Sequence, residues 1–209
     1  MENVSNILNE KFMPQFNNWI LELKNIGYNS SWSKIKACDY GGGTVRERVF
    51  MISTLDTFPI FIFPKKTGTT KTILDYLEEP DPKYFIDNYT GIDASNKSYT
   101  KSIKLADYNN GGQGNRIYSS LGQGVTLTAS GGGKAGSSGG LYLRGNKIYK
   151  LSPIEMCKVM GWSKEEAQII CSAASDREVG FCLGNAIDLN VMKAIMKEIV
   201  IQYKSQLKN

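Results

Sequence analysis

The sequence has 209 residues, 41% of them hydrophobic and 22% charged, so it can form one domain or two small ones around a real core. It has no histidine, and its four cysteines form no Cys-x-x-Cys pair, which argues against a zinc site and against any triad that needs an imidazole. The apolar run at residues 58–64 is too short to span a membrane, and no secretory signal precedes the first predicted helix. We therefore expect a cytoplasmic protein with no metal and no membrane partner.

An amphipathic helix is predicted over residues 10–27. Pro14 fits its first turn and Gly27 its C-terminal cap, and apolar residues recur at helical spacing: Phe12, Phe16, Trp19, Ile20, Leu23 and Ile26. Residues 32–37 and 48–54 have the composition and alternation of strands. A helix followed by strands is typical of an α/β protein.

A glycine turn separates the two predicted strands. It reads Asp39-Tyr40-Gly41-Gly42-Gly43 and is followed by Arg46 and Arg48, whose spacing places both side chains on the same face of the incoming strand. Paired arginines after such a turn can hold a phosphate, a carboxylate or a base carbonyl. Surface arginines are common, so this pattern alone is a weak signal.

A basic, glycine-rich segment follows a polar linker that contains one short helix at residues 72–77. Residues 97–150 contain eight Lys or Arg, one acid and 12 of the 21 glycines, although the chain as a whole has a net charge of only +5. This composition predicts contact with phosphates, and a flexible basic loop is the alternative. Residues 115–118, 125–128 and 131–134 read as short strand-like pieces, and a disordered loop is the alternative for residues 131–140.

Helices are predicted again after residue 150. Ser152 with Glu155, and Ser163 with Glu166, have the spacing of capping boxes, which predicts one helix ending at Gly161 and another reaching about Ala174. The pair Gly184-Asn185 is expected to open a last helix, which continues through Val191, Ile195, Ile199 and Val200. Each cysteine reads most simply as a small buried apolar side chain.

Four ordered blocks resemble the DNA (cytosine-5) methyltransferase family over nearly the whole chain. Glu2-Asn3-Val4 matches a Glu-Asn-Val tripeptide, and residues 39–50 resemble the block D-Y-G-x-P-Q-x-R-x-R-x-F, with Gly43 and Thr44 in place of Pro and Gln. Residues 149–155 resemble R-x-L-T-P-x-E with Tyr149 in place of Arg, and residues 182–187 resemble Q-x-G-N-x-V with Cys182 in place of Gln. Thr126-Leu127 resembles the Thr-Leu pair of the family's recognition domain.

The resemblance implies an α/β fold with three parts. Residues 1–64 would form the C-terminal part of a Rossmann-like methyltransferase sheet. Residues 65–183 would form the linker and a small, mainly β, glycine-rich target-recognition domain. Residues 184–209 would form a C-terminal helix that returns to the catalytic domain.

The resemblance also implies site residues. Glu2 would contact ring nitrogen N3 of the target cytosine, Arg48 would lie near O2, and Arg46 would support the site. Residues at the last block would touch S-adenosylmethionine, and residues of the glycine-rich domain would contact double-stranded DNA. The cofactor candidates are Gly184, Asn185 and Ala186, and the DNA candidates are Arg116, Thr126, Leu127 and Lys134.

Two features of the family are missing from the sequence: a Pro-Cys dipeptide that carries the nucleophile, and an early glycine-rich cofactor loop. Cys38 lies beside the Asp-Tyr-Gly turn and is not read as the nucleophile. We therefore expect the C-terminal subunit of a split restriction-modification methyltransferase, inactive alone and paired with an N-terminal chain that binds most of the cofactor. The alternatives are a catalytically inactive DNA-binding or regulatory relic and an unrelated glycine-rich binding protein.

Overall fold

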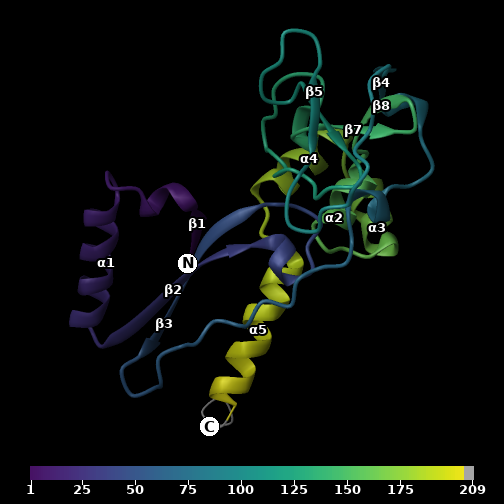
Figure 1. Cartoon of the computed structure of the whole chain (residues 1–209). Helices are drawn as coiled ribbons and strands as arrows, with labels where there is room; N and C mark the ends of the chain where they lie inside the picture. The colour runs from purple at the N-terminus through teal and green to yellow at the C-terminus, as the bar shows by residue number, and fades with distance from the viewer. Residues whose placement is uncertain (205–209) are drawn as a thin grey trace. The chain divides into compact units, whose positions relative to one another are not determined.

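The computed structural model describes residues 1–204, and contacts within the chain divide it into two compact units (Figure 1). Unit 1 contains residues 1–36, 47–66 and 191–204, and unit 2 contains residues 37–46 and 67–190. Both units combine helices with a sheet, which confirms the predicted α/β class. Within residues 1–204 no single helix is long and apolar enough to cross a membrane, although the bent pair α4 (Asp176–Asn185) and α5 (Leu189–Tyr203) meets that test jointly.

Unit 1 is built on a three-stranded antiparallel sheet in the order β1-β3-β2. β1 is Glu2–Val4, β2 is Tyr28–Lys36 and β3 is Glu47–Leu55. The central strand β3 buries three consecutive residues, Val49, Phe50 and Met51, because both faces of a central strand are covered. The two predicted strands are confirmed, and β2 begins earlier than expected.

Helices α1 and α5 complete unit 1. α1 (Met13–Asn25) has Pro14 in its first turn and is followed by Gly27 at φ 87°, as predicted, and its buried Phe16 packs edge-on against Trp32 of β2. α5 (Leu189–Tyr203) belongs to unit 1 from Val191 onward. Its Tyr203 hydroxyl donates to the carbonyl of Pro59 over 2.8 Å, which ties the end of the helix to residues 58–62.

Unit 2 contains a five-stranded sheet in the order β4-β8-β7-β6-β5, in which only the β6–β7 pair is parallel. The strands are β4 (Phe85–Asn88), β5 (Lys104–Asp107), β6 (Arg116–Ser119), β7 (Leu141–Arg144) and β8 (Lys147–Lys150). Side chains of β6, β7 and β8 form one apolar cluster of this unit (Ile117, Leu141 and Ile148), and Tyr142 belongs to a second cluster with Leu127 and Met160. The strands are only four residues long, which fits the small recognition domain expected here.

Three helices follow the sheet, and each begins at a capping box. α2 (Pro153–Val159) begins after Ser152 and α3 (Lys164–Ala173) after Ser163, as predicted. α4 (Asp176–Asn185) begins after Ser175, whose side chain accepts from the backbone N–H of Glu178. This third box and the helix that it opens were not predicted, because no helix was expected between Ala174 and Gly184.

Two predictions about the recognition segment and the last block are wrong. Residues 125–128 and 131–134 form no strand, because their backbone bonds go to side chains and turns: Val125 N–H, for example, donates to the Tyr142 hydroxyl. Gly184 and Asn185 end α4 instead of opening a helix. Residues 186–188 then break the helix, because Ala186 is extended (ψ 158°), and α5 starts at Leu189.

Candidate functional site

Glu2 and Arg48 meet on the sheet of unit 1. The register pairs Glu2 with Phe50 and Val4 with Arg48, so these side chains lie on one face of the sheet. Arg48 Nε lies 3.2 Å from Glu2 Oε1, and Arg48 Nη1 donates to the carbonyl of Glu47 over 2.7 Å. The two side chains are 24% and 19% exposed, so the carboxylate is oriented by a cation and still open to a ligand.

The glycine turn of unit 2 explains two departures from the D-Y-G-x-P-Q block. Gly43 donates its N–H to the carbonyl of Val159 over 3.0 Å, and a Cβ there would lie 2.8 Å from the Tyr76 ring. Proline has no N–H, so it cannot occupy this position. Thr44 is fully buried, and its hydroxyl accepts from the backbone N–H of Arg46 over 3.3 Å, so this side chain stabilises the turn.

Arg46 is also buried, with 4% of its surface exposed. Its guanidinium donates to the carbonyls of Leu127 (3.3 Å), Gly184 (3.1 Å) and Ala186 (2.8 Å). The structure thus brings together residues from three of the sequence blocks: the arginine pair, the Thr-Leu pair and the Gly-Asn pair. We refer to Arg46, Leu127, Gly184 and Ala186 as the Arg46 cluster. Within unit 2, Arg46 holds backbone in place and presents little surface to a ligand.

Gly184 is needed for this arrangement because the chain approaches α4 closely. A Cβ on Gly184 would lie 2.1 Å from the backbone nitrogen of Ala129 and 2.3 Å from the carbonyl carbon of Thr128. Only glycine allows the segment after Leu127 to lie against the last turn of α4. Asn185, next to it, is exposed, and its amide donates to the carbonyl of Phe181 over 3.2 Å.

The predicted DNA-contacting residues fall into two groups. Arg116 and Lys134 are exposed cations, and the backbone N–H of Lys134 donates to the Asn115 side chain over 2.9 Å, so the two cations come from adjoining backbone. Thr126 is partly buried and Leu127 is 1% exposed, so the Thr-Leu pair has its leucine in the core of unit 2. The leucine therefore positions backbone, and the cations are the groups that can reach a phosphate.

None of the four cysteines has the surroundings of an activated nucleophile. Cys38 and Cys157 are buried, and burial raises the pKa of Cys157 to about 12. Burial also raises the pKa of Cys171, and Cys182 is exposed on α4. A nucleophilic thiol needs a lowered pKa, usually beside a cation or a helix N-terminus. Within residues 1–204, no group of three or more His, Cys, Asp or Glu could hold a metal ion.

The predicted cofactor residues offer little to S-adenosylmethionine by themselves. The carbonyls of Gly184 and Ala186 accept from Arg46, and only Asn185 presents an exposed polar side chain. One amide does not make a cofactor site. These three residues alone therefore do not form a cofactor site, and their contact with S-adenosylmethionine stays a prediction.

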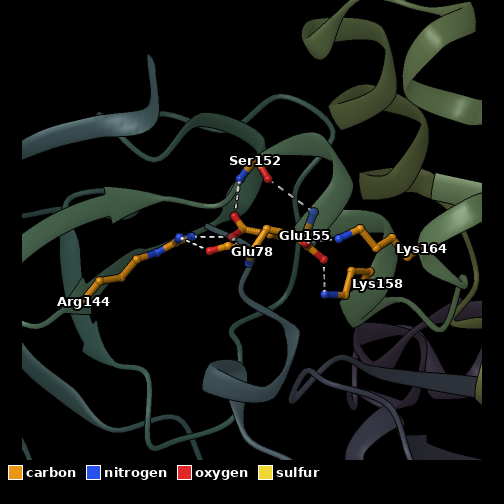
Figure 2. Close-up of polar contacts among 6 residues, drawn as sticks. All are labelled: Glu78, Arg144, Ser152, Glu155, Lys158 and Lys164. Carbon is orange, nitrogen blue, oxygen red and sulfur yellow. Dashed lines mark hydrogen bonds and ion pairs between the residues drawn. The ribbon is translucent and has the colours of Figure 1, made fainter. Parts of the chain in front are cut away.

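Unit 2 contains a polar network that was not predicted from the sequence. Figure 2 shows Glu78 and Glu155 between Arg144 on one side and Lys158 and Lys164 on the other. Hydrogen bonds from the two lysines lower the pKa of the Glu78 carboxyl. Glu155 is 1% exposed, and its Oε1 lies 2.5 Å from Nη2 of Arg144. In the sequence, the only sign of this network is an arginine just before a Gly-Asn hairpin turn. That pattern does not indicate which carboxylate the arginine binds.

Comparison with known proteins places these features in one family. Residues 1–201 match the model of the C-5 cytosine-specific DNA methylase family. The type II methyltransferase M.HhaI of Haemophilus parahaemolyticus is 30% identical over 211 residues, covering 95% of this chain and 62% of that protein. The orphan methyltransferase M.SssI of Spiroplasma monobiae is 29% identical over 207 residues, covering 95% of this chain and 52% of that protein. The chain thus spans about half to three-fifths of the length of these two relatives.

The fold is similar to that of solved methyltransferases. A Spodoptera frugiperda DNMT2 mutant matches with a TM-score of 0.67 at 16% identity, over 95% of this chain and 65% of that one. The structure of the Entamoeba histolytica methyltransferase EhMeth matches with a TM-score of 0.64 at 16% identity, over 96% of this chain and 61% of that one. The protein belongs to the C-5 cytosine-specific DNA methylase family.

Proposed function

We propose that this chain is the C-terminal subunit of a split DNA cytosine-5 methyltransferase. In this proposal it provides target-DNA recognition and part of the cytosine pocket, and a separate N-terminal chain provides the nucleophilic cysteine and most of the S-adenosylmethionine site. The observation that carries the proposal is the Glu2–Arg48 pair, which combines an acid and a cation from two family blocks on one open sheet face.

The chemistry of the reaction gives each of these groups a role. Carbon-5 of cytosine becomes nucleophilic only after a thiolate adds to carbon-6, and negative charge then develops toward N3 and O2. The Glu2 carboxyl, in its protonated form, would donate its proton to N3, and Arg48 would stabilise the charge at O2 while orienting Glu2. When bound, S-adenosylmethionine supplies the methyl group. The exposed cations Arg116 and Lys134 would bind phosphates around the extruded base, whose removal from the stack costs a few kcal/mol.

The surface of unit 1 has features of an interface with a partner protein, which supports the proposal. Among the described residues, β1 pairs with β3 on one side and with no strand on the other, so it leaves an open edge. A hollow of about 380 Å³ beside this edge is lined largely by apolar side chains, including Val4, Phe12 and Trp19. Further apolar side chains of the unit are exposed: Leu21, Ile26, Trp32, Leu55, Ile60, Ile62, Met196, Val200 and Ile201. So much exposed apolar surface is typical of an interface.

The experiment is a methyl-transfer assay on the full chain, alone and with its co-purifying partner. The proposal expects no transfer by the chain alone, and transfer by the pair that is lost when the partner's Pro-Cys cysteine is replaced by alanine. Cys182→Ser in this chain, which removes its exposed thiol, should leave transfer intact. Transfer by the chain alone would overturn the split arrangement. DNA binding by the pair without any transfer would support the inactive relic.

A further inference from the structure

The block at residues 149–155 has Tyr149 where the family pattern has arginine, and a guanidinium from another residue lies against the ring of Tyr149. Arg144 extends from the end of β7, and its guanidinium carbon lies 5.1 Å from the centre of the Tyr149 ring. We propose that Arg144 is the positioning residue that supplies from β7 the cation missing at position 149, and that it fixes the linker against the recognition domain.

The geometry shows what this side chain joins. Arg144 Nη2 donates to Glu155 Oε1 over 2.5 Å, and Nη1 donates to the carbonyl of Glu78 over 3.2 Å. The backbone N–H of Glu78 donates to the same Glu155 Oε1 over 2.8 Å, and that of Ser152 donates to Oε2 over 2.8 Å. One arginine–glutamate pair thus connects three segments: the linker at residue 78, the β7–β8 hairpin and the first turn of α2 (Figure 2).

Burial makes this pair sensitive to loss of either partner. The side chains of Arg144 and Glu155 are 9% and 2% exposed, so removing one leaves the other charge buried. Only a planar guanidinium can reach the carbonyl of Glu78 and the carboxylate of Glu155 together, whereas a lysine ammonium acts as a single point charge. The effect of substitution should therefore depend on the shape of the cation as well as on its charge.

The test uses the full chain with four variants: Arg144→Met, Arg144→Lys, the double variant Arg144→Met with Tyr149→Arg, and Lys147→Met as the control. Lys147 is an exposed cation on the same hairpin, paired with Arg144 across the turn. Melting temperature and hydrogen exchange at the Glu78 amide are the structural measurements. Affinity for a fluorescent duplex of mixed sequence is the functional one.

We expect Arg144→Met to lower Tm by roughly 10 °C and to speed exchange at Glu78 at least about tenfold. Arg144→Lys should fold and show a smaller change in the same direction, which keeps the test decisive where the methionine variant does not fold. In the double variant, arginine at position 149 should restore Tm and the exchange rate, because the Tyr149 ring already lies against the Arg144 guanidinium. The control Lys147→Met should change neither Tm nor exchange.

Unchanged Tm and exchange in Arg144→Met, or no recovery in the double variant, would overturn the proposal. DNA affinity should follow Tm across the three Arg144 variants, and this part rests on the proposed function. The two failures are distinguishable: a wild-type chain that binds no DNA would contradict the proposed function and leave the stability and exchange comparison valid.

Discussion

The guanidinium of Arg48 on β3 lies 3.2 Å from the carboxylate of Glu2 on β1, and both side chains lie on one face of the unit 1 sheet. β1 is only three residues long, so this ion pair and the ladder to β3 together fix where Glu2 points. Because both groups keep about a fifth of their side-chain surface exposed, a base could contact them without unfolding the sheet. In the proposed function this relationship defines the part of the cytosine pocket that the chain supplies.

Replacing Arg46 with methionine should destabilise unit 2. The change leaves the carbonyls of Leu127, Gly184 and Ala186 without their guanidinium partner, and the expected loss is about 3 kcal/mol of unfolding free energy. Urea titration measures it. Arg116→Met, which removes an exposed arginine of the same unit, is the control and should stay within about 0.5 kcal/mol of wild type. Equal stability of the two variants would show that the Arg46 cluster contributes nothing to the fold.

Gly184→Ala should also destabilise unit 2, although alanine favours helices over glycine by up to about 1 kcal/mol. The new Cβ would lie 2.1 Å from the backbone of Ala129, so the segment after Leu127 must move away from α4, at a net cost of about 1–3 kcal/mol. Gly132→Ala is the matched control, because its nearest neighbour would be 3.9 Å away. Thermal unfolding of the two variants gives the comparison, and a stabilised Gly184→Ala chain would refute the close approach.

The exposed cations of the recognition domain should set the salt dependence of DNA binding. In the proposed function, alanine at Arg116 or Lys134 would remove one phosphate contact each, so the slope of log affinity against log salt should fall by about 1 per substitution. Fluorescence anisotropy at several salt concentrations measures the slope. Lys24→Ala on α1 should leave it unchanged, and an unchanged slope in the Arg116 and Lys134 variants would remove these residues from the DNA interface.

The Glu78 carboxyl should make stability depend on pH in the acid range. Hydrogen bonds from Lys158 and Lys164 lower its pKa below the usual 4.5, so folding favours the charged form. This contribution is complete above pH 4.5 and is lost as the pH falls through the lowered value. The Tm difference between wild type and Glu78→Gln should therefore shrink in acid, and a difference that grows in acid would contradict the assigned direction.

Local hydrogen-bond patterns were predictable from the sequence, and contacts between distant segments mostly were not. The boxes at Ser152 and Ser163 and the cap at Gly27 depend on residues a few positions apart, so spacing alone indicates them. Gly184-Asn185 can begin or end a helix, and spacing does not reveal that the pair ends α4 with Ala186 extended.

The site residues divide in the same way. The resemblance predicted that Glu2 and Arg48 would lie close together, but nothing in the sequence indicated that Arg46 would be buried among three carbonyls. Residues 125–128 have strand composition and still form no strand, because a strand also needs a neighbour with free backbone groups. The ion pair of Arg144 with Glu155 was not predicted, because it depends on how the β7–β8 hairpin packs on α2.

The most direct test of the account is methyl transfer from labelled S-adenosylmethionine to DNA by the chain with its partner, comparing wild type with Glu2→Gln. The account predicts a loss of about 10²–10⁴-fold in rate with DNA affinity retained, because the amide cannot protonate N3. Glu10→Gln, at an exposed position in the same unit, should be as active as wild type. A Glu2→Gln enzyme with the wild-type rate would contradict the central claim.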